Sequence, residues 1–129
     1  MRFAVGVVND MLYAVGRDEK ASGALPSVQA YNPATDSWTV TRSARKPCSD
    51  LGSGVINGLL YAVGGFDGRV LHMVEAYDPA TNAWAAKTPM PMARAALAVA
   101  GDRRTLYAVG GYNPAKNDGW LNTLEAFTP

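Results

Sequence analysis

The sequence contains little of what most catalytic and metal-binding sites need. Its 129 residues include one cysteine, Cys48, and one histidine, His72. A lone cysteine excludes a disulfide within the chain and a cluster of thiolates around zinc. A catalytic or ligand histidine needs partners within hydrogen-bond reach, and the sequence pattern points to none. We expect Cys48 to be a small buried residue, His72 to be structural or exposed, and the chain to have no catalytic residue, metal or cofactor.

The sequence also has no large excess of charge of either sign. Twelve Lys and Arg residues oppose eleven Asp and Glu residues, which leaves a formal net charge of +1. Proteins that bind nucleic acids usually carry a basic patch, because cationic side chains release counterions from the phosphates. The densest basic cluster, at residues 42–46, lies close to Asp50 and is interpreted as a solvated loop. The sequence therefore argues against a nucleic-acid partner.

Long hydrophobic runs are missing as well. No apolar stretch reaches the roughly 18 residues that a membrane-spanning helix needs. The apolar start at residues 1–10 lacks the long hydrophobic region and cleavage site of a signal peptide, and its alternation is typical of a strand. The overall content of 48% hydrophobic and 18% charged residues is ordinary for one globular domain. We expect no membrane partner, and the compartment stays open, a cytoplasmic one being compatible with the sequence.

An internal repeat dominates the chain. The string Leu-Tyr-Ala-Val-Gly occurs at residues 12–16, 60–64 and 106–110. A second string, in which Ala-Tyr precedes Pro-Ala-Thr and then Trp, occurs at 30–38 and 76–84, and a third copy begins at 124–129. Self-similarity with a period of this length is typical of solenoids and propellers, in which each repeat is one supersecondary unit.

Each period holds four strand-like runs bounded by turn residues. In the middle unit they fall at about 51–56, 59–64, 72–77 and 83–87. Asn57-Gly58 favours a type I′ hairpin between the first two runs, and no segment has a helical period. Four antiparallel strands per repeat predict an all-β fold of propeller blades. We expect about three blades, the last one incomplete, at about 1–42, 43–88 and 89–129.

The middle unit resembles the Kelch repeat, in which a double glycine after an apolar strand is followed at a fixed distance by Tyr and Trp. Here these residues are Gly64-Gly65, Tyr77 and Trp84. The sequence of residues 74–82 is similar to bacterial Kelch repeats in particular. The resemblance recurs in register over nearly the whole chain. It implies that the chain is a partial Kelch-type β-propeller.

The other two units depart from this pattern in places. The third has Gly110-Gly111, with Phe127 in place of the Tyr. The first has Tyr31 and Trp38, but Arg17 replaces its second glycine. We expect the glycines to allow positive φ and close approach near the axis, and the aromatic residues to fill contacts between blades. Glu75 and Glu125 are expected to hold loops by hydrogen bonds. All of these residues are interpreted as architectural.

Length variation is confined to one class of loop. From Val28 to Leu60 and from Val74 to Leu106 the chain keeps the same spacing of 32 residues. All variation falls between the second and third strands of a unit. Insertions of one loop class tend to lie on one face, often the binding face, although such loops can also simply tolerate change. The three loops are 17–27, 66–71 and 112–121.

Aromatic and Arg residues in exposed loops are the types that form binding hot spots. The resemblance implies that these loops, with the connections between fourth and first strands, line the ligand-binding face. Arg94 lies in such a connection, where Cys48 is its counterpart, and we expect it to line the central opening. The candidate partner-binding residues are Arg17, Phe66, Asp67, Arg69, Arg94, Tyr112, Lys116 and Trp120.

A protein–protein interaction module that presents these loops to an unknown protein partner is the favoured function. Two alternatives stay open: a part of a carbohydrate-active propeller enzyme, mutarotase-like or oxidase-like, and a structural spacer. A propeller typically has about 4–8 blades, and a shorter stack leaves an apolar face open at each end. We therefore expect either a fragment of a longer Kelch protein or self-association of copies that closes a ring.

Overall fold

The computed structural model describes residues 3–16, 27–41 and 48–129, and these ranges contain eleven strands and no helix. The first sheet has the order β1 (Phe3–Val8), β2 (Met11–Gly16), β3 (Ser27–Asn32) and β4 (Ser37–Thr41). The second consists of β5 (Gly52–Ile56), β6 (Leu59–Val63), β7 (Val74–Asp78) and β8 (Ala83–Lys87). The third consists of β9 (Ala98–Asp102), β10 (Thr105–Val109) and β11 (Leu124–Phe127).

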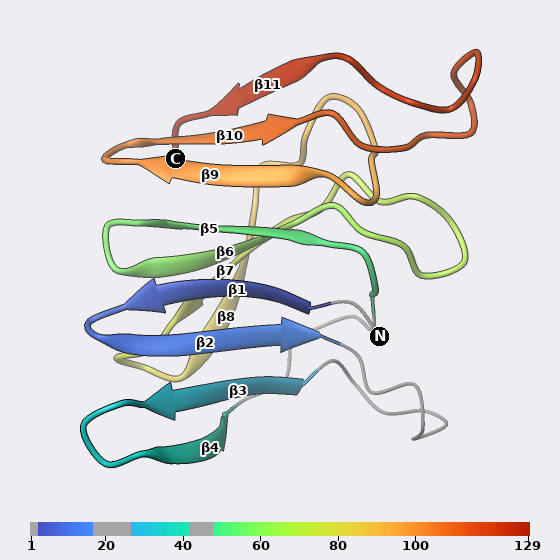
Figure 1. Ribbon diagram of the computed structural model, residues 1–129. Helices are drawn as coiled ribbons and strands as arrows, with labels where there is room; N and C mark the ends of the chain where they lie inside the picture. Colours follow the sequence, from blue (N-terminus) through green and yellow to red (C-terminus); the bar gives the residue numbers. More distant parts are fainter. Residues whose placement is uncertain (1–2, 17–26, 42–47) are drawn as a thin grey trace.

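Neighbouring strands pair antiparallel in chain order, and the second sheet is stacked between the other two (Figure 1). The all-β prediction is therefore confirmed, and the third sheet has three strands where the others have four. Nothing in the described ranges forms a helix with the length and hydrophobicity required to cross a bilayer.

Local sequence explains the hairpins. Asn57 and Gly58 have φ values of 50° and 73°, and this pair of positive values is what a type I′ turn requires. Asn9 and Asp10, with φ of 49° and 62°, play the same part between β1 and β2. The turn from β7 to β8 begins where the Asp78 carboxylate accepts a hydrogen bond from the Ala80 amide at 2.9 Å, as an Asx-turn does.

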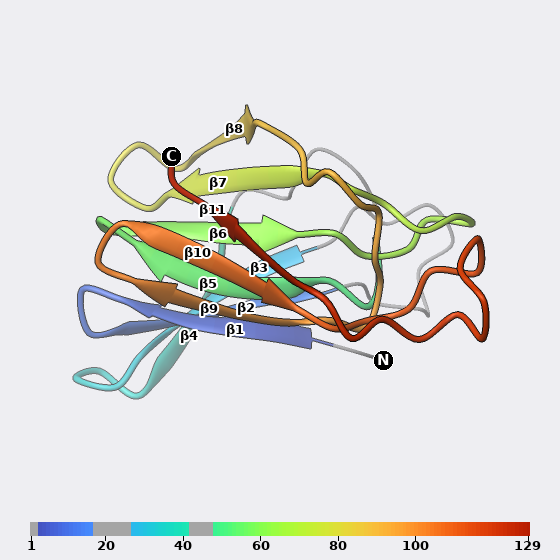
Figure 2. The same cartoon turned by 90° about the horizontal axis from the view of Figure 1, so that it is seen from above.

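The first strands of the three sheets lie side by side, with little room between them (Figure 2). The Ser53 hydroxyl of β5 donates a hydrogen bond to the Val5 carbonyl of β1 at 2.7 Å. A Cβ atom added at Gly101 of β9 would lie 2.2 Å from the Val55 carbonyl oxygen of β5. Glycine is therefore needed at residue 101 because backbone meets backbone there.

Two apolar cores hold the stack together, one at each interface between sheets. The core between the first and second sheets includes Tyr13, Val15, Val28, Leu60 and Tyr77, all buried. The core between the second and third sheets includes Tyr61, Val63, Val74, Leu106 and Ala108, also buried. The second sheet thus contributes one face to each core, as a blade within a propeller does.

The two outer faces of the stack are apolar and exposed. On the first sheet, Phe3, Val5 and Val7 are 51%, 57% and 59% exposed. On the third sheet, Val109 and Leu124 are 43% and 59% exposed. Adjacent exposed apolar residues of this kind are uncommon on the surface of an isolated domain.

The double glycines lie where the chain leaves β6 and β10. Gly64 and Gly65 have φ of 65° and 108°, and Gly110 and Gly111 have 63° and 103°. A Cβ atom at Gly64 would lie 2.3 Å from the Arg94 carbonyl oxygen. Both the left-handed backbone and the close approach require glycine here.

The Tyr and Trp residues of the repeat form matched pairs. The rings of Tyr31 and Trp38 lie 5.0 Å apart, and those of Tyr77 and Trp84 lie 5.2 Å apart, both tilted by 40°. Tyr77 is buried and also contacts Tyr13 of the first sheet at 5.8 Å. Trp84 is only partly buried, and Trp38 is 57% exposed on the open outer face. The Tyr thus contributes more to the contact between blades than the Trp does.

Candidate functional site

The loops that follow β6 and β10 project from the same end of the stack, opposite the tight hairpin turns (Figure 1). Arg94 lies in the connection from β8 to β9, which reaches this end, and Arg17 falls outside the described residues. The loop after β6 carries Phe66, Asp67 and Arg69, and the loop after β10 carries Tyr112, Lys116 and Trp120.

Phe66 and Tyr112 occupy equivalent places in the second and third sheets. The Phe66 amide donates to the Ser49 carbonyl, and the Tyr112 amide donates to the Ala95 carbonyl, each at 2.8 Å. Each aromatic residue also forms a β-bridge within its own loop, Phe66 with Val70 and Tyr112 with Trp120. Backbone pairing therefore holds both rings on a rigid support.

The structure brings three of the predicted residues together around one hollow. A cavity of about 360 Å³ lies between the two loops. Trp120 is 66% exposed and Phe66 is 41% exposed, and the Tyr112 and Trp120 rings meet edge to face at 5.4 Å. The cavity is lined by Asp50, Phe66, Val70, Ala95, Ala96, Tyr112, Pro114 and Trp120.

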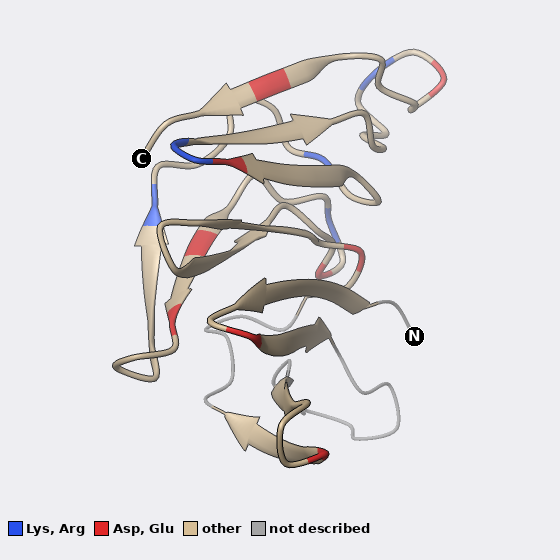
Figure 3. Ribbon diagram, turned by 60° about the vertical axis from the view of Figure 1, so that its left-hand side comes forward, with Lys and Arg blue, Asp and Glu red and all other residues tan. Residues whose placement is uncertain are grey.

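The charged candidates lie around this cavity and do not line it. Arg69 is 81% exposed and its Nε atom lies 4.0 Å from the Asp67 carboxylate. Lys116 lies in a turn, where its amide donates to the Asn113 carbonyl at 3.0 Å. Both signs of charge occur at this end of the described structure (Figure 3). The arrangement is an apolar hollow with a polar rim, which is usual for an interaction surface.

Asn113 supports the loop, and sequence reasoning missed it. Its side chain is buried, and Nδ2 donates to the Ala93 carbonyl at 2.8 Å while Oδ1 accepts from the Ala115 amide at 3.0 Å. Its backbone amide donates to the Gly119 carbonyl at 2.7 Å. The Asn-Pro pair at 113–114 was the signal that could have found it, since Asn commonly initiates a turn through its own side chain.

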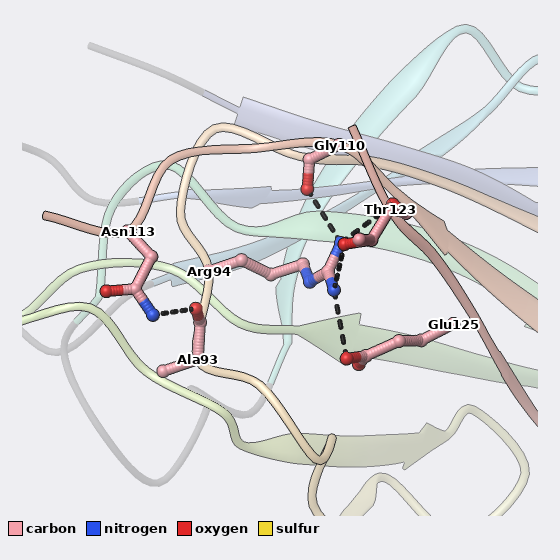
Figure 4. A network of polar contacts seen from close by, with 6 residues as sticks. All are labelled: Ala93, Arg94, Gly110, Asn113, Thr123 and Glu125. Atoms are coloured by element: carbon pink, nitrogen blue, oxygen red, sulfur yellow. Dashed lines mark hydrogen bonds and ion pairs between the residues drawn. The ribbon is translucent and has the colours of Figure 1, made fainter. Parts of the chain in front are cut away.

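Arg94 does not line an opening, which corrects the expectation from the sequence. Its side chain is completely buried, and its guanidinium bridges the connection before β9 to the segment before β11 (Figure 4). Nη1 donates to the carbonyls of Gly110 and Thr123 at 2.8 and 3.1 Å. Nη2 lies 3.0 Å from the Glu125 carboxylate and donates to the Thr123 hydroxyl at 3.2 Å. Arg94 is thus occupied within the blade and is not presented to a partner.

Cys48 takes the place of Arg94 in the preceding blade and is completely buried, as expected. Burial raises the pKa of its thiol from 9.0 to about 11, and the negative charges of Glu75 and Asp67 add to the shift. The thiol therefore stays protonated at neutral pH. A nucleophilic cysteine needs the opposite shift.

Within the described ranges, no three His, Cys, Asp or Glu side chains lie together in a way that could hold a metal ion. His72 is exposed. Burial also raises the pKa of the Tyr61 and Tyr13 hydroxyls, so both stay neutral at ordinary pH.

The sequence matches the family model of the Kelch motif at residues 1–43 and 47–91. Kelch-like ECH-associated protein 1B of Danio rerio is 38% identical over 72 residues, which are 54% of this chain and 12% of that protein. An F-box/kelch-repeat protein of Arabidopsis thaliana is 36% identical over 63 residues, 49% of this chain and 17% of that protein. The matched stretches thus span less than a fifth of the length of these relatives.

The fold also has a solved counterpart. The structure of YjhT superposes with a TM-score of 0.75 and 17% identity over 99% of this chain and 52% of the other. At this level of identity the likeness concerns the fold alone, and it supports a partial propeller. The motif matches cover more than half of the sequence and coincide with the first two sheets. The chain therefore belongs to the Kelch-motif family, and its three sheets are blades of a Kelch-type β-propeller.

Proposed function

We propose that this chain is a non-catalytic protein-interaction module that receives an apolar side chain of a partner protein in the hollow between Phe66, Tyr112 and Trp120. The hollow carries the proposal, because it combines exposed aromatic rings with backbone that is already held in place. A rigid aromatic surface loses little conformational entropy on binding. Asp67, Arg69 and Lys116 supply a polar rim of the kind that surrounds such contacts.

The relatives are consistent with a role of this kind. The name of the Danio rerio protein describes it as ECH-associated, and Kelch repeats occur in both relatives next to further sequence that this chain does not match. The placement of Arg94 also favours a binding role over a sugar-processing one. Its side chain is buried, and both Nη atoms of its guanidinium are engaged by Gly110, Thr123 and Glu125 within the blade.

A peptide-display selection tests the proposal while the partner protein is still unidentified. Peptides that bind the chain are selected and then measured against Trp120→Ala and against Arg69→Ala, which changes an exposed residue outside the hollow. We expect Trp120→Ala to weaken the selected peptides at least about tenfold, as the loss of a hot-spot residue does, and Arg69→Ala to weaken them far less. Peptides that bind wild-type and Trp120→Ala equally would place the binding surface elsewhere.

We further propose that the three blades are part of a larger ring, whose other blades cover the two open faces. The open face of the first blade carries Val7, Leu12, Tyr31 and Trp38. The corresponding face of the second blade carries the same residue types in the same register, and it packs against the first blade. The corresponding residues are Val55, Leu60, Tyr77 and Trp84.

The span of the solved counterpart agrees with a ring of about twice this size, because the chain covers 52% of it. The missing blades then belong either to a longer chain that contains residues 1–129 or to a second copy. Light scattering after size exclusion separates the two. A discrete dimer supports self-association, and a monomer that binds a hydrophobic dye supports a piece of a longer propeller. A stable monomer that binds no dye would contradict the ring.

A further inference from the structure

The hollow between the loops that follow β6 and β10 contains a negative charge as well as aromatic rings. Phe66 lines it from the first loop, and Tyr112 and Trp120 line it from the second. Among the described residues that line it, only Asp50 has a charged side chain, and its Oδ1 atom is shielded from solvent. Three aromatic side chains and a carboxylate around one small space are the elements of a site for an organic cation.

The backbone beside the hollow already uses carbonyl groups for its own hydrogen bonds. The Ala95 carbonyl accepts from the Tyr112 amide at 2.8 Å, and the Asp50 carbonyl accepts from the Ala96 amide at 2.8 Å. A primary ammonium group carries three N–H donors, and each needs an acceptor once it leaves water. A quaternary ammonium group has no N–H donor, so it loses fewer hydrogen bonds on entering a hollow of this kind.

The cationic side chains of the two loops lie outside this hollow. Arg69 is 81% exposed, and its Nε atom lies 4.0 Å from the Asp67 carboxylate. Lys116 lines a separate hollow, which it shares with Asp118. A cation inside the aromatic hollow therefore meets the negative charge of Asp50, and electron-rich ring faces add to the attraction where the cation lies against them.

The size of the hollow suits one head group on a slender chain. Its volume of about 360 Å³ is near the lower end of the range for ligand pockets, about 300–1,000 Å³. Ala95 and Ala96 contribute only methyl groups to the lining. Phe66 and Trp120 are 41% and 66% exposed, so a guest enters from solvent without first separating the loops.

We propose that the hollow binds the trimethylammonium head of a trimethylated lysine on a partner protein. This inference rests on the proposed function and names the side chain that the hollow receives. The head exposes only methyl groups, so its surface is apolar although it carries a full positive charge. The rings of Phe66, Tyr112 and Trp120 contact the methyl groups, and Asp50 offsets the charge. The flexible four-carbon stem of lysine lets the head enter while the partner backbone stays at the polar rim.

Choline and its neutral carbon analogue, in which a tert-butyl group replaces the trimethylammonium group, are the first probes. The two have nearly the same shape and differ in charge. NMR titration follows the Phe66 and Tyr112 amides. We expect choline to bind at least about tenfold more tightly than the analogue. Equal binding of the two would overturn the cation site and leave the proposed apolar contact standing, so the two proposals fail separately.

Variants of the lining identify the groups that recognise the charge. Asp50→Asn removes the carboxylate, and Trp120→Leu removes the indole ring but keeps an apolar side chain. Each should remove most of the preference for choline. Asp102→Asn is the matched control, because it removes an exposed carboxylate at the hairpin end of β9, and it should leave the preference intact. If Asp50→Asn does not fold, the two probes and Trp120→Leu still test the site. A preference that survives Trp120→Leu would contradict it.

A peptide with one lysine between glycine and serine residues, in unmethylated and trimethylated forms, tests the source of the ammonium group. Fluorescence anisotropy of the labelled peptides measures binding. We expect the trimethylated form to bind at least about tenfold more tightly than the unmethylated form, and more tightly than choline does. Equal binding of the two forms would overturn the proposal. Choline binding as tight as that of the trimethylated peptide would assign the hollow to a small cation and overturn the protein partner.

Discussion

The guanidinium of Arg94 lies 3.0 Å from the carboxylate of Glu125, and the arginine end of this ion pair is entirely buried. The pair joins the connection before β9 to β11, and the same guanidinium holds the Thr123 carbonyl. Two residues that are 31 positions apart in the sequence are thus held together by one ion pair.

Arg94→Met should destabilise the chain by about 3 kcal/mol, since removal of one partner of a buried pair leaves the other charge and its carbonyl neighbours unsatisfied. Chemical denaturation measures the change. Arg69→Met is the matched control, because Arg69 is 81% exposed and its pair with Asp67 is long, and we expect less than about 0.5 kcal/mol from it. Similar losses in both variants would show that the network around Arg94 contributes nothing beyond a surface pair.

The aromatic residues of the repeat should differ in their contributions to stability. Tyr77→Ala removes a buried ring from the core between two blades and should cost about 3–5 kcal/mol. Trp84→Ala should cost less, about 2 kcal/mol, because its ring is only partly buried. Trp38→Ala changes the equivalent residue on an open face and should cost under about 1 kcal/mol. The order Tyr77, Trp84, Trp38 is the test, and a Trp38 loss equal to that of Trp84 would show that the open face is covered in solution.

The repeat made the fold predictable. Strings such as Leu-Tyr-Ala-Val-Gly and the pair Asn57-Gly58 determine strand position and hairpin type locally, and both depend on backbone preferences that act over a few residues. The burial of Cys48 and the grouping of Phe66, Tyr112 and Trp120 in adjacent loops also followed from register. Equivalent residues in adjacent repeats must lie near one another when the repeats stack.

The role of Arg94 could not be predicted in the same way. Its partners Gly110, Thr123 and Glu125 lie far along the chain, and only the three-dimensional arrangement shows that they converge on one guanidinium. Asn113 was missed for a related reason, since its side chain bonds to the Ala93 carbonyl of a different connection. Alignment of the repeats shows which residues are equivalent. It does not show which polar atoms of distant segments form hydrogen bonds with one another.

Alkaline pH should destabilise the chain through Cys48. Burial raises the pKa of its thiol to about 11, with Glu75 and Asp67 adding, so the folded state keeps the proton that an unfolded thiol loses near pH 9.0. The stabilisation is present below pH 9 and is lost as pH rises toward 11, by about 1–2 kcal/mol. Tyr13 and Tyr61 also have raised pKa values, so Cys48→Ala is the control and should flatten this part of the curve. The unfolding free energy measured at pH 8 and pH 10.5 gives the comparison.

Gly101→Ala should disrupt the contact between the second and third blades. Its φ lies outside the left-handed region, so the cost is steric, and the added Cβ would meet the Val55 carbonyl oxygen at 2.2 Å. The carbonyl oxygen is part of the backbone and the Cβ atom is bonded directly to it, so neither atom can rotate away from the other. We expect the free energy of unfolding to fall by about 2 kcal/mol. Ala100→Ser, at the exposed neighbouring position, is the control and should be nearly neutral. Hydrogen exchange of the β9 and β10 amides should increase in the Gly101→Ala variant alone. Unchanged exchange would show that close packing at Gly101 does not help to hold the second and third blades together.

Trp120→Ala should leave the fold intact, although the ring meets Tyr112 at 5.4 Å. The indole is 66% exposed, and the loop is held independently by the bonds of Asn113 to Ala93 and Gly119. We expect a change in unfolding free energy under about 1 kcal/mol. Asn113→Ala should be the more destabilising change, by about 1–3 kcal/mol, because it removes a buried side chain and leaves the half-buried Ala93 carbonyl without its donor. If Trp120→Ala proves the more destabilising of the two, the indole is part of the loop's support and the hollow is not a preformed surface for a partner.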